Sequence, residues 1–404
     1  MSHNPKNPTD PITTEVIRRA FQGIAEEMGV TLIRTAYSTN IKERRDCSCA
    51  VFSPKGELIS LAEHIPIHLG SMLGLMKKIT RENDPNSFHS GDVIIANDPY
   101  LGGGSHLPDI TLIRPVLVEG RLSAFAANIA HWSDVGGSFP GAGTAGASTE
   151  IYQEGFRLPP TWIQVKGRLQ EELLDFILSN MRGRDERAGD FRAQLASLNQ
   201  GEKRLQELFN RFGKPTISKC LASILDYSER RLRQKIREIP EGEYSFQDYM
   251  DDDGISKQKL LIKVLVKISH GKAPLITFDF DGTSPQAEGG INMVRPALEA
   301  SVYYAVKALT APNVPMNAGF QRPVQIIAPE GCLVNAREPA AVGGRTDTCQ
   351  RVVDVILGAL SRAVPEKIMA ASNGATTALV FGGSKKLSGR NFVYVEALGG
   401  GMGA

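Results

Sequence analysis

Apolar and polar positions follow two different periods along the chain of 404 residues, and each period predicts one kind of element. Behind Asp10 and Pro11, which suit the cap and the first turn of a helix, five apolar residues recur at helical spacing. They are Ile12, Val16, Ala20, Ile24 and Met28. We therefore expect a helix from about residue 10 to residue 36 that buries this face.

Alternating patterns typical of strands follow this helix. The stretch CAVFSPKGELISL, at 49–61, predicts a hairpin around a Pro-Lys-Gly turn. Residues 109–132 predict a second hairpin that turns at Glu119 and Gly120. Residues 170–236 return to helical spacing, and strand patterns then alternate with two amphipathic helices after residue 243.

This order of elements predicts an α+β fold with mixed, mainly antiparallel sheets and packed helices. We expect several domains: an N-terminal α+β region at 1–160, a helical region at 161–240 and a C-terminal α+β domain at 241–404. The final strand pattern runs into the glycine-rich end GGGMGA. Since such a strand usually leads to another element, we expect the natural chain, or a partner, to continue the fold beyond Ala404.

Composition narrows the class of protein. A net charge of +2 gives no electrostatic reason to expect nucleic acid or an anionic membrane as partner. Five cysteines are few and odd in number, so a reducing compartment fits better than a disulfide framework. The N-terminus has neither the charge nor the apolar run of a secretory signal, and no stretch is apolar enough to span a membrane. We expect a cytoplasmic protein.

The densest group of reactive side chains lies between residues 97 and 137. Two segments place a histidine three residues before an aspartate: His106 with Asp109, and His131 with Asp134. Since the strands between them form a predicted hairpin, both histidines fall at its open end and should meet. Imidazole with carboxylate is a ligand set for Zn, Mn or Fe. The alternative is a set of hydrogen-bonded loop histidines and turn aspartates.

Other candidates surround this group. Asp46 precedes a buried strand pattern, where it is either a salt-bridged anion or a further metal ligand. The neighbouring Cys47 and Cys49 are interpreted as buried structural thiols rather than as ligands or nucleophiles. Pro66 prevents a metal pair of His64 and His68 inside one helix, although His68 is a candidate pocket residue.

Glycine-rich loops elsewhere give one further candidate. Arg345 follows the stretch AAVGG at the start of a predicted helix, where it would suit an anion or a carbonyl oxygen, unless this is an ordinary tight loop. No Walker, GxSxG or HExxH pattern is present in the sequence.

Eight segments together resemble the hydantoinase B/oxoprolinase family. They are NIKERRDCSCAVF, EHIPIHLGSM, GDVIIANDPYLGGGSHLPDI, AHWSDVGG, EIYQEGFRLPP, DFDGTSPQAEGGIN, VPMNAGFQRPV and PEGCLVNAREPAAVGG. Their order resembles the family from about residue 10 to the last residue. The resemblance implies a divalent metal ion held by Asp46, His106, Asp109 and His131, with Asp134 orienting His131. Family members usually continue past the GGGMGA end, which this chain does not.

The resemblance also implies a partner and a reaction. Family members work with a hydantoinase A-type subunit that binds ATP and Mg, so we expect a hetero-oligomer acting on a hydantoin, N-methylhydantoin, 5-oxoproline or lactam. The partner would phosphorylate the amide, and metal-bound water would attack it, with His68 or Asp134 as base. Two alternatives stay open: a subunit of an ATP-dependent ketone carboxylase of the acetone or acetophenone type, and a non-catalytic scaffold for the ATP-binding subunit.

Overall fold

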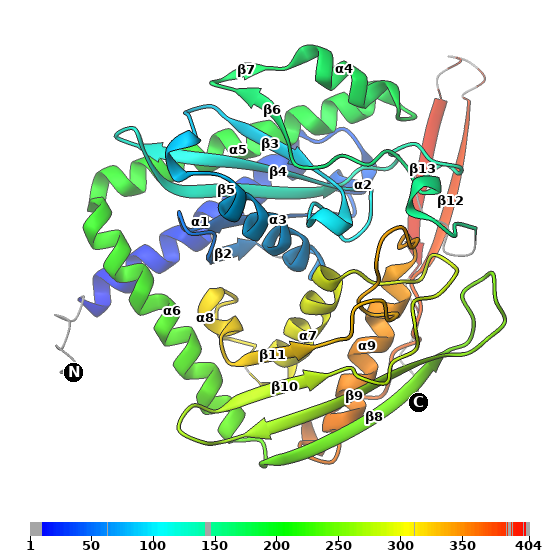
Figure 1. Cartoon of the computed structure of the whole chain (residues 1–404). Helices are drawn as coiled ribbons and strands as arrows, with labels where there is room; N and C mark the ends of the chain where they lie inside the picture. The colour runs from blue at the N-terminus through cyan, green and yellow to red at the C-terminus, as the bar shows by residue number, and fades with distance from the viewer. Residues whose placement is uncertain are drawn as a thin grey trace.

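The computed structural model describes residues 10–62, 64–141, 147–310, 312–384, 386, 389, 391–398 and 400. The glycine-rich end of the chain at 401–404 lies outside these residues. Two β-sheets with helices packed on them make up the described part (Figure 1). The predicted α+β class with mainly antiparallel sheets is confirmed.

The first sheet has seven strands within the described residues, in the order β2-β1-β5-β4-β3-β6-β7, and every pair is antiparallel. They are β1 (Cys47–Phe52), β2 (Leu58–Ala62), β3 (Val93–Ala96), β4 (Asp109–Val118), β5 (Arg121–His131), β6 (Thr161–Val165) and β7 (Arg168–Leu169). Both predicted hairpins are present, as β1–β2 and β4–β5. The sheet thus extends past residue 160, where we predicted a boundary.

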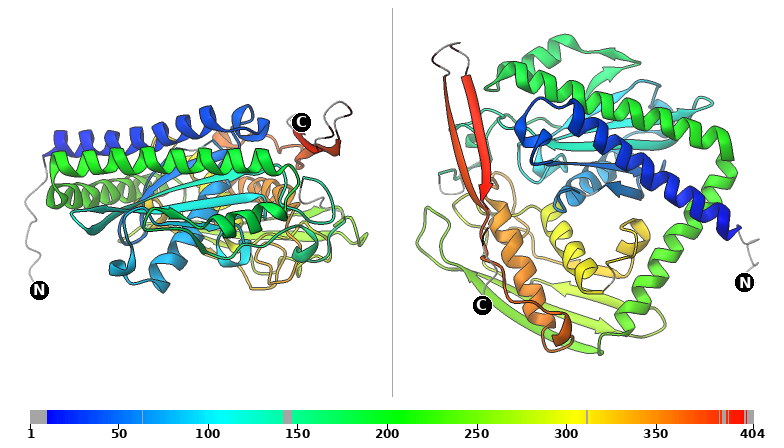
Figure 2. Two further views of the ribbon diagram at one scale, coloured as in Figure 1. Left: turned by 90° about the horizontal axis from the view of Figure 1, so that it is seen from above. Right: turned by 180° about the vertical axis from the view of Figure 1, so that it is seen from behind.

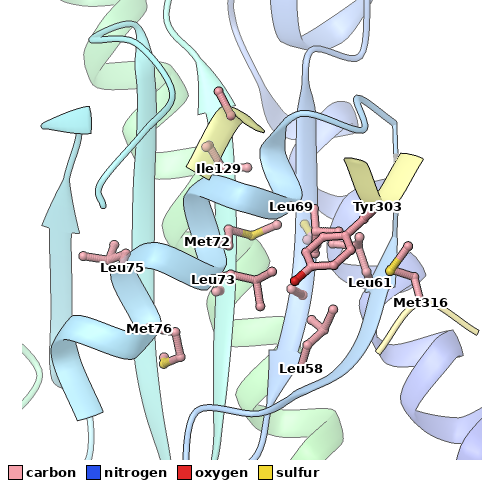
Figure 3. Packing of buried hydrophobic residues seen from close by; sticks show 14 of the residues in the cluster. Leu58, Leu61, Leu69, Met72, Leu73, Leu75, Met76, Ile129, Tyr303 and Met316 are labelled. Atoms are coloured by element: carbon pink, nitrogen blue, oxygen red, sulfur yellow. The ribbon is translucent and has the colours of Figure 1, made fainter. Parts of the chain in front are cut away.

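Helices cover both faces of this sheet, which explains why its central strands are buried along almost their whole length. On one face lie α1 (Pro11–Thr35) and α5 (Arg184–Phe212), side by side (Figure 2). On the other lies α3 (His68–Glu82), whose Leu69, Met72 and Leu73 belong to the core between the sheet and helix α7 (Arg295–Thr310) (Figure 3). The sheet and its helices form one continuous core.

Helix α1 begins where predicted, because the Asp10 side chain accepts hydrogen bonds from the amides of Ile12 and Thr13. Its buried face differs from the prediction: Ile12 and Val16 are largely exposed. The buried residues are Ile17, Phe21, Ile24, Ala25, Met28, Gly29 and Leu32. Strict four-residue steps drift by about 40° per step around a helix, so the predicted series leaves the contact face within two turns.

Helices α4 (Glu171–Ser179), α5 and α6 (Lys214–Arg237) confirm the predicted helical block, and α6 leads to the second sheet. That sheet has the order β11-β10-β9-β8, with only the β10–β11 pair parallel among the described residues. Its strands are β8 (Gly242–Met250), β9 (Leu260–Ser269), β10 (Leu275–Asp279) and β11 (Val324–Ile327). Helices α7 (Arg295–Thr310) and α9 (Arg345–Leu360) lie between the second sheet and the half of the molecule that contains the first sheet.

Besides short 3₁₀ turns, three smaller elements remain in the described part. They are helix α2 (Thr39–Lys42), helix α8 (Ala318–Gln321) and the hairpin of β12 (Thr377–Ser384) with β13 (Asn391–Leu398). Helix α3 joins the two halves, since Gly70 packs so closely on the carbonyl group of Pro296 that a Cβ atom would overlap it. In the part of the chain that is described, no helix is long and apolar enough to cross a membrane.

Candidate metal centre

The open end of the β4–β5 hairpin gathers the predicted ligands. Asp109 is the first residue of β4 and His131 the last of β5, and the two are direct partners in the ladder. The preceding turn brings the His106 ring beside that of His131, with ring centroids 4.9 Å apart. The hairpin pattern therefore predicted correctly that the two histidines meet.

Asp109 lies at the middle of the group and is fully buried. Its Oδ1 atom is 3.3 Å from Nε2 of His106 and 3.6 Å from Nε2 of His68. Its Oδ2 atom accepts a hydrogen bond of 2.8 Å from the Ser105 hydroxyl. One oxygen thus faces the imidazoles, while the other is held by the protein.

Asp46 joins the group from the start of β1. Its Oδ1 atom lies 3.5 Å from Nε2 of His68, and Arg44 lies 3.6 Å from its Oδ2 atom. The backbone carbonyl of Asp46 also accepts the amide hydrogen of His131, at 3.0 Å. The pairing of β1 with β5 therefore carries Asp46 to the hairpin end that holds His131.

His68 lies closer to these residues than the sequence indicated. It is the first residue of α3, is 1% exposed, and its Nδ1 atom is 3.2 Å from the Ser48 hydroxyl. Its Nε2 atom lies between the carboxylates of Asp46 and Asp109. We predicted a pocket residue or base. The contacts place His68 among the candidate ligands.

Asn40 was missed. Its side-chain amide lies 3.0 Å from Nδ1 of His131 and donates to the His131 carbonyl at 2.9 Å. Arg44 donates to the Asn40 Oδ1 atom, which fixes the amide in turn. Asn40 therefore orients the His131 ring, and its only sequence signal was a polar residue in the charged run before β1.

Asp134 does not take the place that we predicted. Its Oδ1 atom accepts from the amides of Gly136 and Arg182, and its Oδ2 atom accepts from the amide of Gly141. The Arg182 guanidinium also pairs with Oδ2, at 3.0 Å. The predicted contact with His131 is thus absent from the contacts of Asp134, since turn amides and an arginine surround its carboxylate.

Arg345 reaches the site from the start of α9. Its Nε atom donates to the Ser105 hydroxyl at 3.0 Å, and a terminal nitrogen lies 3.4 Å from Oδ2 of Asp109. The anion that it contacts is therefore a carboxylate of its own chain. A contact with substrate stays a prediction.

The sequence model of the hydantoinase B/oxoprolinase family matches residues 10–404. The chain belongs to this family. It is 35% identical to 5-oxoprolinase 1 of Arabidopsis thaliana over 99% of this chain and 32% of that protein. It therefore spans about a third of that relative's length.

Two solved structures resemble the chain as well. ATP-dependent caprolactamase from Pseudomonas jessenii matches with a TM-score of 0.87 and 30% identity, over 96% of this chain and 66% of that one. Acetone carboxylase matches with a TM-score of 0.86 over 96% of this chain and 53% of that one, and its 17% identity establishes a shared fold only.

The chemistry of this family member's site suits a divalent ion. Both ring nitrogens of His106 and the Oδ1 atom of Asp109 are buried without a hydrogen bond. The Nε2–Oδ1 separations of 3.3 to 3.6 Å are close to the about 3.4 Å between neighbouring ligands of a tetrahedral ion. Among the described residues, however, no three or more His, Cys, Asp or Glu side chains are arranged so that they could hold a metal ion. The types of donor fit a divalent ion, and the ion itself is a proposal.

The electrostatics keep the donors in their binding forms. Burial, assisted by Arg345, lowers the pKa of His106 to about 3, and burial also lowers the pKa of His131. Burial works to raise the pKa of Asp109, but His106 and His68 outweigh it and hold that pKa well below its usual value. Neutral imidazoles and an ionised carboxylate are the forms that coordinate a metal.

The two cysteines beside Asp46 take no part. Cys47 and Cys49 are fully buried in β1, and the Cys49 thiol lies 3.6 Å from the Ser197 hydroxyl. Burial raises the pKa of both thiols, that of Cys49 to about 12. Neither is a thiolate at neutral pH, which agrees with the interpretation as structural residues.

Proposed function

We propose that this chain is the B-type, metal-binding subunit of a cytoplasmic, ATP-dependent hydrolase of cyclic amides. The observation that carries the proposal is the largely buried group of Asp46, His68, His106, Asp109 and His131, which four separate segments bring together. Burial of such a group costs folding free energy unless its members are paired or coordinate a metal, and groups of this kind are concentrated at functional sites. The names of the relatives, which are 5-oxoprolinase and caprolactamase, support cyclic amides as substrates.

Asp46, His106, Asp109 and His131 would hold the ion, and His68 is a fifth candidate ligand. A divalent ion in this place would polarise a substrate oxygen and lower the pKa of a bound water from about 15.7 toward neutrality. The protein itself supplies the arrangement. Ser105 and Arg345 hold one oxygen of Asp109, and Asn40 fixes the ring of His131. Burial keeps both His106 and His131 uncharged.

The reaction that we propose requires a second subunit. An A-type partner would transfer the γ-phosphoryl group of ATP to the amide oxygen, which makes the amide carbon electrophilic. Water then adds to that carbon, and the ring C–N bond breaks with protonation of the nitrogen, which leaves an acyl phosphate. A second water hydrolyses the acyl phosphate to the carboxylate and free phosphate. The products are the open-chain amino acid, ADP and phosphate. His68, which lies between two carboxylates, is the candidate base for the water proton.

Two observations support the expected setting of this subunit. All five cysteines are unpaired and buried, as suits a reducing cytoplasm. No Walker pattern is present in the sequence, so ATP would bind to the partner together with Mg.

The test is to co-produce the chain with its A-type partner and measure bound metal and ATP-dependent ring opening. Hydantoin, N-methylhydantoin, 5-oxoproline and caprolactam are the substrates to compare. We expect metal in the complex and turnover of at least one ring. ATP turnover that needs bicarbonate and a ketone would identify a carboxylase instead, and a fully active complex free of metal would identify a scaffold.

A further inference from the structure

Glu154 is a buried carboxylate whose hydrogen bonds go to residues other than the candidate ligands. It follows the 3₁₀ turn Ile151–Gln153 and is 3% exposed. Its two oxygens accept from the amide of Val342, at 3.0 and 3.1 Å, and its Oε1 atom accepts from the amide of Gly343 at 2.7 Å. A charged group in such a position is costly, so its contacts should matter.

The two amides that Glu154 binds belong to the turn that precedes α9. The carbonyl of Val342 accepts from the amide of Arg345 at 3.1 Å, and the amide of Gly344 donates to the carbonyl of Gly290 at 2.7 Å. Arg345 then contacts Ser105 and Asp109. An unbroken series of contacts thus leads from Glu154 through this turn and Arg345 to Asp109.

The chain segment that carries Glu154 is itself hydrogen-bonded to neighbouring segments. The amide of Phe156 donates to the carbonyl of Val135 at 2.7 Å, just after the Trp132–Asp134 loop. The amide of Ile151 donates to the carbonyl of Pro339 at 2.8 Å. The Tyr100 hydroxyl donates to the carbonyl of Ala340 at 2.5 Å. These hydrogen bonds therefore fix the position of the Glu154 segment relative to the turn.

The charge of Glu154 is sensitive to pH near neutrality. Burial raises its pKa to about 7, although the amides of Gly343 and Val342 and the charge of Arg345 work in the opposite direction. Tyr100 also faces Glu154, and Glu338, Arg157 and Asp98 surround that tyrosine. A protonated carboxyl group is a weaker acceptor for the two amides than a carboxylate.

We propose that Glu154 is a positioning residue that keeps Arg345 on Asp109 by binding the turn before α9, and that protonation of Glu154 loosens this hold. Glu154 then couples the arrangement of Asp109 to pH without touching a candidate ligand. The inference that this coupling affects a metal on Asp109 depends on the function proposed above. The inference concerning the turn does not.

The first test is hydrogen–deuterium exchange of the full chain. In the wild type, exchange of the Val342 and Gly343 amides, corrected for the intrinsic rate, should slow by about tenfold as pH rises from 6 to 8. Glu154→Gln should remove this dependence, and Glu154→Asp should keep part of it. Glu338→Gln, which removes a more exposed carboxylate paired with Arg157, is the control and should behave like the wild type. Equal protection in Glu154→Gln and wild type at both pH values would overturn the proposal.

The second test is a double-mutant cycle of Glu154→Gln with Arg345→Gln, read as the dissociation constant for added Zn or Mn. If Glu154 acts through Arg345, we expect Glu154→Gln alone to weaken binding about tenfold and to add little in the Arg345→Gln background. Fully additive effects would overturn the proposal. If the wild-type complex opens no ring substrate, the proposed function fails, while the exchange and binding results still decide the role of Glu154.

Discussion

Asp109 and His131 are opposite partners in the β4–β5 ladder, at the end of the hairpin away from its turn. Backbone hydrogen bonds therefore set the separation of these two candidate ligands, and the side chains need only choose rotamers. His106 precedes the same strand by one turn and faces His131. The hairpin is thus the rigid part of the candidate centre, to which Asp46 and His68 are added from β1 and α3.

Removal of either histidine of the hairpin should remove the metal. We expect His106→Ala and His131→Ala to bind less than a tenth of the metal of the wild type, because each removes a donor that no neighbour can replace. Elemental analysis after dialysis measures this. His89→Ala, at a half-exposed histidine that faces Asp92, should keep the full amount. Full metal in both variants would contradict the proposed ligand set.

Asn40→Ala tests the residue that orients His131. The variant loses the contacts with the His131 ring and carbonyl, so the affinity for Zn or Mn should fall by about 10- to 100-fold. A competition titration with a metal chelator measures the change. Asn86→Ala, in an exposed turn, is the control. An unchanged affinity in Asn40→Ala would mean that the ring is held by the surrounding packing alone.

Asp134→Asn separates stability from metal binding. Asparagine presents an NH₂ group to one pair of donors that the carboxylate now satisfies, so the free energy of unfolding should fall by about 2–4 kcal/mol. Chemical denaturation measures this loss. The metal content should be unchanged below the unfolding transition. A variant of normal stability that loses its metal would restore the role that we first predicted for Asp134.

The stability of the metal-free protein should depend on His106 in acid. Its pKa is about 3 when folded and about 6.5 when unfolded, so the unfolded state binds more protons between these values. The stability that neutral His106 contributes is complete above pH 6.5 and is lost as pH falls toward 3. The free energy of unfolding of the wild type minus that of His106→Gln, measured by urea unfolding with a chelator present, should fall by about 1.4 kcal/mol per pH unit from pH 6 to pH 4. A constant difference would contradict the assignment.

The sequence was sufficient for elements whose pattern is local. The Asp109–His131 hairpin could be predicted because strand periodicity and a Glu-Gly turn lie in one continuous segment. The start of α1 could be predicted because a cap needs only Asp10 and the amides that follow. Its buried face was predicted only in part, since it depends on where α5 and the sheet lie, and the sequence of α1 does not contain that information.

Contacts between distant segments could not be predicted in this way. Asn40 and His131 are adjacent only because β1 pairs with β5, and a single asparagine in a charged run carries no signal of that contact. Asp134 misled for the opposite reason: its spacing from His131 matches that of Asp109 from His106, but the chain after β5 turns away and takes the carboxylate with it. Similar spacing gave different surroundings.

The candidate centre includes Asn40, His68, the Ser105–Asp109 turn, His131 and Arg345, so its arrangement is complete only once α9 has docked against the first sheet. Contacts between segments so far apart along a chain form late, because loop closure must be paid for first. The rate of metal uptake during refolding would therefore report the rate of the last step of assembly. An intermediate that has formed the first sheet alone should be unable to capture the ion firmly.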